Sequence, residues 1–326
     1  MAIQQNSAVQ GWIPVRIASK HDEAEDVVVI ELVSAAGDDL PPFTAGSHVD
    51  VEIAPGLVRQ YSLCNAPDAS RHYRIGVLKE PNSRGGSIAV HNNLQVGHEI
   101  RISGPRNLFE LDSSAKRVKL LAGGIGITPI LAMAEQLLRA DVPFTLNYCC
   151  RAEGKAAFKN YLSTPPFNAM VSFHFDEGGV RLNPPKDIGS WEEGSHLYVC
   201  GPGGFIDFVL GSARELGWPD ASVHREYFVA PIIETGDDRD FEVKLASTGQ
   251  CVRVSAEQTI VEALASVGVE IPMSCEQGIC GTCLTRVIEG TPEHRDMFLT
   301  KEEHALNNQM TLCCSRSKSK VLVLDV

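Results

Sequence analysis

Four cysteines near the C-terminal end of the sequence have a spacing that can hold a metal cluster. Cys275, Cys280 and Cys283 are separated by four and then two residues, and Cys313 follows after twenty-nine more. This spacing is typical of a plant-type 2Fe-2S site and differs from the paired two-residue gaps of zinc ribbons. The glycines and small residues of SCEQGICGTC, residues 274–283, let a backbone wrap closely around a cluster and point N–H groups at its sulfur atoms. The sequence therefore predicts an iron-sulfur centre.

The same region leaves one choice and one alternative open. Cys314 stands next to Cys313, and only the spacing favours Cys313 as the fourth ligand. The alternative to a cluster is a zinc knuckle or a group of free thiols in a core. The cysteines that we assign to packing, the usual role of a buried thiol, are Cys64, Cys149, Cys150 and Cys251.

A one-electron centre needs an electron donor, and glycine-rich turns in the middle of the chain offer a site for one. The string LLAGGIGITPIL, residues 120–131, predicts a buried strand, a glycine turn and a helix, with Thr128 capping the helix and Pro129 in its first turn. A second turn, YVCGPGGF at residues 198–205, follows another strand. Such turns point N–H groups at a phosphate, and two of them at the carboxyl ends of strands favour a nucleotide site. Tight packing of strand against helix gives the same strings, so that alternative stays open.

Two further strings, nearer the N-terminus, can bind a flat ring and a phosphate. In RQYS, residues 59–62, Arg59 and Tyr61 point to one face of a strand, so that a guanidinium can hold a phosphate while the phenol covers a ring. Ser62, at the end of that strand, can hydrogen-bond the ring. In SRGGS, Arg84 and the glycine N–H groups lead into a helical stretch, which again favours a phosphate. Each string alone also fits an ordinary surface strand or turn.

The composition limits the partners and the compartment. The 326 residues carry a net charge of -12, which argues against a nucleic acid or an anionic membrane as the main partner. The N-terminal residues lack the basic head and apolar run of a signal peptide, and no apolar stretch approaches membrane-spanning length. We expect a cytoplasmic protein, in which ten cysteines favour metal or redox chemistry over a disulfide framework.

The elements that must position these residues fall into three blocks. Alternating apolar runs over residues 12–112 predict an antiparallel barrel or sandwich. From Val118, strands alternate with helical patterns such as TPILAMAEQLLRA, which indicates a parallel sheet with crossover helices. A polar, acidic stretch at residues 232–240 reads as a linker. The last block opens with the strand pair FEVKLAS and CVRVSA and continues through a helix, TIVEALASVG, to the cysteines.

The order of these motifs resembles the phthalate dioxygenase reductase family, whose members supply electrons to Rieske-type oxygenases. The motifs are RQYS, GGS, AGGIGITP, YVCGP, EYF and the cysteine set, with HRDMFLT and CCSRSKSKVLVLDV near the end. The resemblance covers essentially the whole chain. It implies an antiparallel flavin-binding β-barrel over residues 1–112, a ferredoxin-reductase-like α/β NAD domain over 113–231, and a C-terminal β-grasp 2Fe-2S ferredoxin domain over 241–326. Because related reductases with the ferredoxin part first use FAD, the domain order implies FMN.

The resemblance also implies roles for individual residues. Glu226 is implied as a neighbour of the flavin, and Asp176 as the partner of the adenosine ribose hydroxyls, where a carboxylate disfavours the extra phosphate of NADPH. Arg151 is a residue that can point toward NADPH instead. The residues implied at the FMN are Arg59, Tyr61, Ser62, Arg84, Gly85, Gly86, Ser87 and Phe228; those at the NAD are Gly123, Gly124, Gly126, Thr128, Cys200, Gly201 and Pro202; those at the metal are Cys275, Cys280, Cys283 and Cys313.

Electron counting then gives the mechanism that we expect. NADH gives up two electrons as a hydride, a cluster accepts one at a time, and a flavin can do both. Ser62, Cys200 and Phe228 would surround the reacting rings, and single electrons would pass from the cluster to a terminal Rieske-type oxygenase that docks transiently near the cluster loop. We expect a monomer. The alternatives are a reductase that serves a P450 or an O-demethylase, and an iron-sulfur redox sensor; the substrate of the oxygenase stays open.

Overall fold

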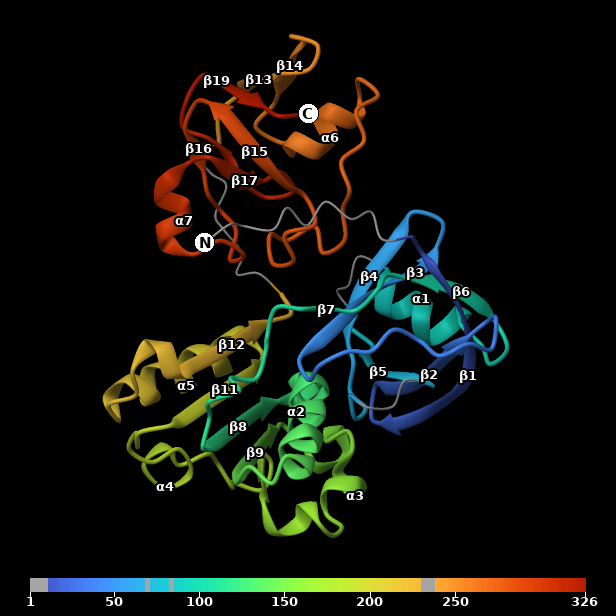
Figure 1. The fold of residues 1–326 in the computed structure, drawn as a ribbon, viewed down its shortest axis with the longest axis vertical. Helices are drawn as coiled ribbons and strands as arrows, with labels where there is room; N and C mark the ends of the chain where they lie inside the picture. The colour runs from blue at the N-terminus through green and yellow to red at the C-terminus, as the bar shows by residue number, and fades with distance from the viewer. Residues whose placement is uncertain (1–10, 68–70, 82–84, 230–237) are drawn as a thin grey trace. The chain divides into compact units, whose positions relative to one another are not determined.

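The computed structural model describes residues 11–67, 71–81, 85–229 and 238–326. Its contacts divide the chain into two compact units, one ending at Glu226 and one beginning at Tyr227. The first unit holds two sheets, drawn from blue to yellow in Figure 1, and the second holds the orange and red elements. Each unit has a hydrophobic interior of its own, so each can be understood from its own residues.

The N-terminal sheet is an antiparallel barrel. Its strands follow the spatial order β4-β3-β6-β1-β2-β5, and the short β7 pairs with β3. A bridge between Leu63 and Ile75, together with a 2.9 Å hydrogen bond from the Cys64 N–H to the Arg74 carbonyl, joins the two ends of the sheet. The strands are β1 (Ile13–Ala24), β2 (Val27–Ser34), β3 (Ser47–Ala54), β4 (Leu57–Ser62), β5 (Tyr73–Leu78), β6 (Glu99–Ile102) and β7 (Arg106–Asn107).

Alternation of apolar and polar residues produces this barrel. Val49 and Val51 of β3 and Ile75 and Val77 of β5 are at most 1% exposed and fill the interior, because every second residue of a strand points the same way. The helix α1 (Gly86–Asn93) packs on the barrel through Val90, which is fully buried. The barrel predicted from the strand pattern is therefore confirmed.

The second sheet is an α/β layer with the order β10-β9-β8-β11-β12. The pairs β10/β9, β9/β8 and β8/β11 are parallel, and the strand order reverses between β8 and β11. Figure 1 shows α2 and α5 on either side of these strands. The elements are β8 (Arg117–Gly123), α2 (Ile127–Arg139), β9 (Phe144–Cys150), α3 (Lys159–Leu162), β10 (Val171–Phe175), α4 (Pro184–Asp187), β11 (Ser195–Gly201), α5 (Gly203–Glu215) and β12 (Val223–Tyr227). Both glycine turns therefore lie where the strand order reverses, the usual place of a nucleotide in such sheets.

The start of α2 differs from the prediction. Gly126, not Thr128, precedes the first helical residue, and Thr128 is the second residue of the helix. Its hydroxyl donates to the Ile125 carbonyl at 3.0 Å instead of capping the helix. A 3-10 turn over Gly124–Gly126 leads directly into α2, and Gly126 already has helical dihedral angles, with φ -59° and ψ -7°, so the helix begins earlier than the Thr-Pro pair indicated.

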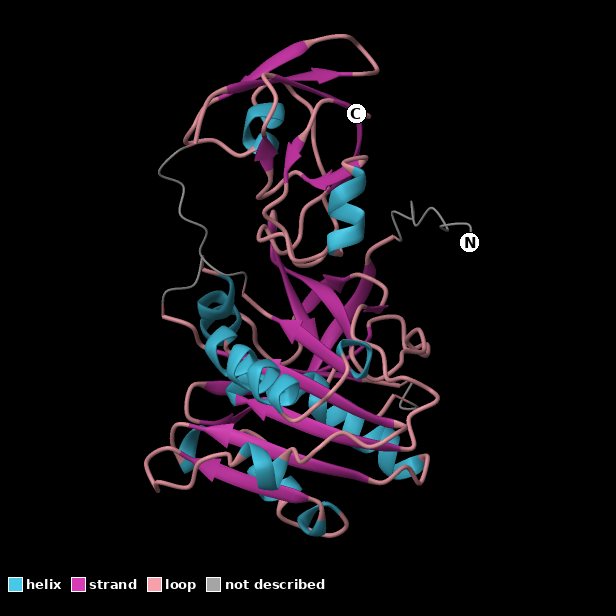
Figure 2. Ribbon diagram, turned by 90° about the vertical axis from the view of Figure 1, so that its left-hand side faces the viewer, coloured by secondary structure: helices cyan, strands magenta, loops and turns pink. Residues whose placement is uncertain are grey.

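The second unit contains a mixed sheet of the β-grasp type. Its order is β14-β13-β19-β15-β17. The pair β13/β19 is parallel, and the pairs β13/β14, β15/β17 and β15/β19 are antiparallel. The helices α6 and α7 each begin with a capping box, formed by a threonine and a glutamate three residues later. The elements are β13 (Phe241–Leu245), β14 (Cys251–Val254), α6 (Ile260–Ala265), β15 (Leu284–Glu289), β16 (Pro292–Glu293), α7 (Lys301–Leu306), β17 (Gln309–Thr311), β18 (Arg316–Ser317) and β19 (Val321–Leu324). Figure 2 shows these strands and helices by type.

Paired charges hold the first residues of this unit. Arg316 is a buried residue, with only 6% of its surface exposed. Its guanidinium donates hydrogen bonds to the carbonyls of Arg239, Ser255 and Gln258 at 2.8–3.1 Å. Asp238 forms ion pairs with Arg295 and, at 3.6 Å, with Arg316. Hydrogen bonding to Arg295 lowers the pKa of Asp238. The unit is therefore fastened before its first strand begins.

Each of the three predicted segments, 1–112, 113–231 and 241–326, contains one of the main sheets, while their exact boundaries stay predictions. Most of the predicted linker, residues 232–237, lies outside the described residues. In the part of the chain that the structure describes, none of the helices combines the length and the apolar character needed to cross a bilayer.

Gly126 gives a test of the α/β layer. A Cβ added at Gly126 would lie 2.3 Å from the Cys200 carbonyl oxygen, whereas one at Gly211, inside α5, would have nothing within 4 Å. We expect Gly126→Ala to lower the free energy of unfolding by about 1–3 kcal/mol because backbone must move. Gly211→Ala should raise it by up to about 1 kcal/mol through helix propensity. Thermal unfolding followed by circular dichroism measures both, and an unchanged Gly126→Ala midpoint would contradict the close approach.

Candidate functional site

The phosphate end of the predicted flavin site lies between β4 and α1. Arg59 pairs with Val51 of β3, and its side chain packs on Gly86 so closely that a Cβ there would lie 2.6 Å from its Cγ. Gly85, which precedes α1, has a left-handed φ of 85°. A guanidinium beside a helix N-terminus is an arrangement that binds anions, because both present N–H donors and positive charge.

Ser87 and Arg84 flank the same helix start. The Ser87 hydroxyl oxygen accepts the Glu80 N–H at 3.1 Å, so its own proton is free to be donated elsewhere. Arg84 lies outside the described residues, and its predicted role at the phosphate stays a prediction.

Tyr61 and Ser62 end the same strand. Tyr61 pairs with Val49 and packs against the barrel interior, and burial raises the pKa of its phenol far above neutrality. The ring therefore stays uncharged and can cover a flat apolar ring. Ser62 is 6% exposed and stands opposite His48 of β3.

The two glycine turns interlock through their backbones. A Cβ at Gly201 would lie 2.9 Å from the Cα of Gly123, and Gly126 meets the Cys200 carbonyl as described above. Much of this glycine content is thus explained by packing, the alternative that the sequence left open. Gly124 has nothing within 4 Å of its Cβ position, and Pro202 stands exposed as the residue before α5. These two positions face space that a nucleotide can use.

The barrel approaches the same turn. A Cβ at Gly76 of β5 would lie 2.9 Å from the Thr128 Cγ2, and Thr128 is 2% exposed. The Thr128 hydroxyl is already used by Ile125, so this side chain contributes packing between the two sheets of the first unit. Its predicted place along the NAD stays a prediction.

Cys200, at the end of β11, is buried, and the neighbouring Glu226 on β12 is half-buried with its Oε2 shielded from solvent. Cys200 is fully buried, and burial, with the nearby Glu226 charge, raises the pKa of its thiol. Burial also raises the pKa of Glu226 to about 8. Its Oε2 has no hydrogen-bond partner among the described residues. At neutral pH the pair is therefore a thiol beside a protonated carboxyl that is able to donate a hydrogen bond.

The sequence named Glu226 only as a neighbour of the flavin and not as a site residue. Its only signal was its place in the EYF motif, because the three consecutive polar residues of HRE, 224–226, show no apolar alternation that would mark a costly charge. Phe228, one residue past β12, is partly exposed and belongs to the second unit, so its predicted place beside the flavin stays a prediction.

Asp176 directly follows β10. Its N–H donates to the Cys150 carbonyl at 3.1 Å, while its carboxylate is exposed and lies 4.0 Å from the Arg181 Nε. The residue thus stands at the carboxyl edge of the sheet, where a ribose can reach it. Its role in choosing NADH stays a prediction.

In the second unit, the four predicted ligand cysteines come together. Hydrogen bonds with the Cys280 and Cys313 thiols lower the pKa of Cys275, and one with Cys313 lowers that of Cys283. Backbone N–H groups point at the sulfur atoms: that of Gly278 lies 3.2 Å from the Cys313 Sγ, and those of Gln277 and Ile279 lie 3.4 Å from the Cys275 Sγ. Four converging thiols with N–H donors around them fit a 2Fe-2S cluster.

Cys314 lies beside Cys313 and against the cluster loop, and its other polar partners are Thr311 and Ser315, whereas Cys313 also bonds to Cys275 and Cys283. The Cys314 Sγ lies 3.3 Å from the Thr311 hydroxyl and 2.4 Å from the Cβ position of Gly278. The geometry therefore favours Cys313 as the fourth ligand. Of the cysteines assigned to packing, Cys64 and Cys150 are buried and Cys149 is half-buried, but Cys251 is exposed on β14, so that assignment is wrong for Cys251. Its strand alternates, and Val252 rather than Cys251 faces the interior.

A second layer supports the cluster loop. The Met297 N–H donates to the Gly278 carbonyl at 3.0 Å, and the buried Asp296 accepts from the Leu299 N–H at 2.8 Å and from His304 at 3.2 Å. His294, Asp296 and His304 bring donor atoms within 4.8 Å of one another. The two imidazole rings stack, however, with centroids 4.3 Å apart and planes 21° apart. A metal about 2.0–2.1 Å from each nitrogen cannot lie in both ring planes, so this cluster holds the loop by hydrogen bonds.

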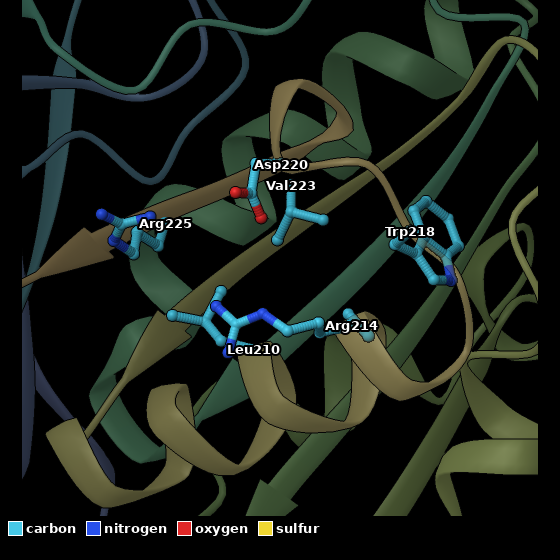
Figure 3. A pocket seen from close by; sticks show the side chains of 7 residues that line it. Leu210, Arg214, Trp218, Asp220, Val223 and Arg225 are labelled. Atoms are coloured by element: carbon cyan, nitrogen blue, oxygen red, sulfur yellow. The ribbon is translucent and has the colours of Figure 1, made fainter.

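A small cavity of about 50 Å³ lies between α5 and the start of β12. Figure 3 shows Arg214, Asp220 and Arg225 around it, with Trp218 at one side. It has room for one or two water molecules, so it cannot hold a nucleotide.

Comparisons with known proteins agree with this geometry. Residues 243–318, which include all four predicted ligand cysteines, match the family of 2Fe-2S iron-sulfur cluster binding domains. The solved structure of phthalate dioxygenase reductase superposes with a TM-score of 0.77 at 37% identity, over 97% of this chain and 98% of that one. The vanillate O-demethylase oxidoreductase of Pseudomonas sp. (strain HR199 / DSM 7063) is 52% identical over 316 residues, 96% of this chain and all of that one.

The chain belongs to the phthalate dioxygenase reductase family. It is an oxidoreductase, the reductase component of an oxygenase system, and its cofactors are a flavin, NADH and a 2Fe-2S cluster. The predicted family and the predicted fold are both confirmed. A similar structure also occurs in an intact type IV self-sufficient cytochrome P450 monooxygenase, with a TM-score of 0.84 and 34% identity over 99% of this chain and 43% of that longer one.

The choice between the neighbouring cysteines of this reductase can be tested directly. Cys313→Ser should abolish the 2Fe-2S signal in electron paramagnetic resonance of the reduced protein, because one of four ligands is lost. Cys314→Ser should keep the cluster, since Cys314 bonds to Thr311. A lost cluster in Cys314→Ser, with an intact one in Cys313→Ser, would reverse the assignment.

The Glu226 carboxyl makes stability depend on pH. The folded state keeps its proton up to pH about 8, whereas the unfolded chain releases it near 4.5. Between these values the unfolded state binds fewer protons, so the free energy of unfolding falls as pH rises. Glu226→Gln removes this dependence on pH. The free energy of unfolding of the variant, relative to that of the original chain, should therefore rise by at most about 5 kcal/mol between pH 5 and pH 9.

Urea unfolding of both proteins, freed of flavin, at pH 5 and pH 9 measures the effect. All other titrating groups are shared, so they cancel in the comparison. Equal pH slopes for the two proteins would mean that Glu226 is ionised in the folded state.

Proposed function

We propose that this chain is the NADH-dependent, FMN-containing reductase of a Rieske-type oxygenase that removes the methyl group of a methoxylated aromatic acid, with vanillate as the first candidate. The observation that carries the proposal is the 52% identity, over the full length of the relative, to a vanillate O-demethylase oxidoreductase. Two further relatives of that name are 51% and 47% identical. A surface that recognises one particular oxygenase is more easily conserved between two reductases that are 52% identical than between two that are 37% identical, the value that this chain shares with phthalate dioxygenase reductase.

The FMN is proposed to lie with its phosphate against Arg59 and the start of α1. The donors at the phosphate would be the Arg59 guanidinium, the N–H groups of Gly85 and Gly86 and the Ser87 hydroxyl, with Arg84 beside them. Tyr61 would cover the ring, and Ser62 would hydrogen-bond it at the strand end. When bound, FMN supplies the exchange between a two-electron hydride donor and a one-electron acceptor.

The nicotinamide nucleotide is proposed to cross the edge where β8 and β11 end. Gly123, Gly124, Gly126, Gly201 and Pro202 would face the pyrophosphate. The Asp176 carboxylate would accept the ribose hydroxyls and repel the extra phosphate of NADPH, which supports the preference for NADH.

Cys200 and Glu226 are proposed to line the nicotinamide end of this site. A neutral thiol and a protonated carboxyl leave that end without a negative charge, and their burial excludes water from it. Phe228 would cover the flavin on the same side. Thr128 would line the nucleotide site at the same turn, with its side chain packed against the barrel.

Cys275, Cys280, Cys283 and Cys313 are proposed as the cluster ligands. The surrounding N–H groups would stabilise the charge on the sulfur atoms and raise the reduction potential of the site. Single electrons would leave through the exposed rim of this loop to the oxygenase, in a weak and transient complex. A cytoplasmic location is proposed, supported by NADH as the electron source and by ten cysteines without a disulfide. A monomer is proposed as the simplest state.

A second candidate is the reductase of a P450. This candidate is supported by the self-sufficient P450 chain, which contains a similar structure that covers 99% of this sequence. The two candidates differ only in the electron acceptor, so they are separated by supplying each acceptor in turn.

The test is reconstitution with a Rieske-type O-demethylase oxygenase. In a mixture of NADH, this chain, that oxygenase and vanillate, formaldehyde should be released at a rate proportional to the concentration of the reductase. Cys280→Ser should stop formaldehyde release yet keep NADH-dependent reduction of ferricyanide, because the flavin part is intact. Formaldehyde release by the Cys280→Ser variant would contradict the route through the cluster. Electron delivery to a P450 but not to the oxygenase would contradict the proposed partner.

A further inference from the structure

A single ammonium closes the C-terminal end of α1. Lys20, which extends from the middle of β1, donates hydrogen bonds to the carbonyls of Val90 at 2.9 Å, His91 at 2.7 Å and Leu94 at 2.7 Å. An ammonium has three protons, and all three are used. These carbonyls belong to the last turn and the C-terminal cap, where a helix carries partial negative charge and lacks partners of its own.

The other end of α1 is the proposed phosphate site. An eight-residue helix is about 12 Å long, so an anchor at one end constrains the position of the other. Isolated helices of this length are marginal in water, so tertiary anchors decide where it lies. Besides Lys20, the anchors are the His91 ring, 2.9 Å from the Val77 carbonyl, the Ser87 hydroxyl, and Val90 in the barrel interior.

We propose that Lys20 is a positioning residue for the FMN phosphate, an inference that rests on the proposed function. It does not touch the phosphate. By fixing the C-terminal end of α1 and balancing its negative charge, Lys20 holds the N-terminal N–H groups against Arg59, where the phosphate binds. The ammonium and the phosphate are thus the two charged partners of one helix, each at the end that its charge favours.

Riboflavin separates this role from simple support of the barrel. It has the same ring system as FMN and lacks the phosphate. Loss of a residue that only stabilises the barrel would weaken both ligands by the same factor. Loss of a residue that orients the phosphate site should weaken FMN alone, so the ratio of the two dissociation constants is the informative quantity.

The experiment titrates flavin-free full-length protein with FMN and with riboflavin and follows flavin fluorescence. Lys20→Met keeps the length of the side chain and removes its charge. It should weaken FMN binding about tenfold and riboflavin binding by less than about twofold. Lys20→Arg, which keeps a cation, should recover most of the FMN affinity. Lys186→Met, at an exposed position on α4, is the matched control for losing one positive charge and should change neither constant.

The outcomes are distinct. Equal weakening of FMN and riboflavin, or full FMN affinity in Lys20→Met, would overturn the inference. Should Lys20→Met fail to fold, Lys20→Gln and Lys20→Arg give the same comparison at a smaller perturbation. Original protein that binds riboflavin as tightly as FMN would instead contradict the proposed phosphate site. Arg59→Ala could remove the preference for FMN over riboflavin while Lys20→Met keeps it. That result would support the proposed phosphate site and reject only the role of Lys20.

Discussion

The contact between Gly126 and the Cys200 carbonyl sets the geometry on which the first unit depends. No side chain fits there, so the end of β11 and the start of α2 meet through their backbones. Gly76 of β5 brings the barrel to the same place, against Thr128. A barrel strand, a helix start and a strand end are therefore held together by positions without side chains. A flavin on the barrel and a nicotinamide at the sheet edge need this closeness, because a hydride passes only between atoms in near contact.

The proposed anion sites depend on local hydrogen-bond donors and not on a basic protein surface. The chain as a whole is acidic, with a net charge of -12, yet each proposed anion site has its own donors. At α1 the donors are backbone N–H groups and Arg59, and Lys20 compensates the opposite end of the helix. At the cluster they are the N–H groups of the 275–283 loop. Local dipoles can hold a phosphate or a thiolate cluster without a basic surface, so the overall charge stays available for solubility and for the choice of partner.

The parts that the sequence predicted are those with local causes. Strands appeared as alternation, the helix α2 as its periodic run, and the cluster as a cysteine spacing within one loop. The parts that it missed are brought together by folding. Lys20 lies seventy residues and more from the carbonyls it binds. The Glu226 carboxyl is shielded from solvent, and its pKa raised, only because β12 lies beside β11. The predicted Thr128 cap was wrong because Gly126, at the end of a 3-10 turn, already has helical dihedral angles, which the residue preference at one position does not reveal.

The second unit explains how one electron-delivery module can serve different oxygenases. Its interior is formed by its own residues, from Phe241 to Leu324, and Arg316 and Asp238 fasten the chain before the first strand. Nothing in that interior needs an oxygenase to complete it. The cluster loop is likewise supported from inside the unit, by Asp296 and the Met297 N–H. A similar arrangement in a P450 chain and in phthalate dioxygenase reductase would then require changes only at the exposed rim. On the proposed docking at this rim, partner choice would be a property of surface side chains, which can vary while the buried supports of the cluster stay the same.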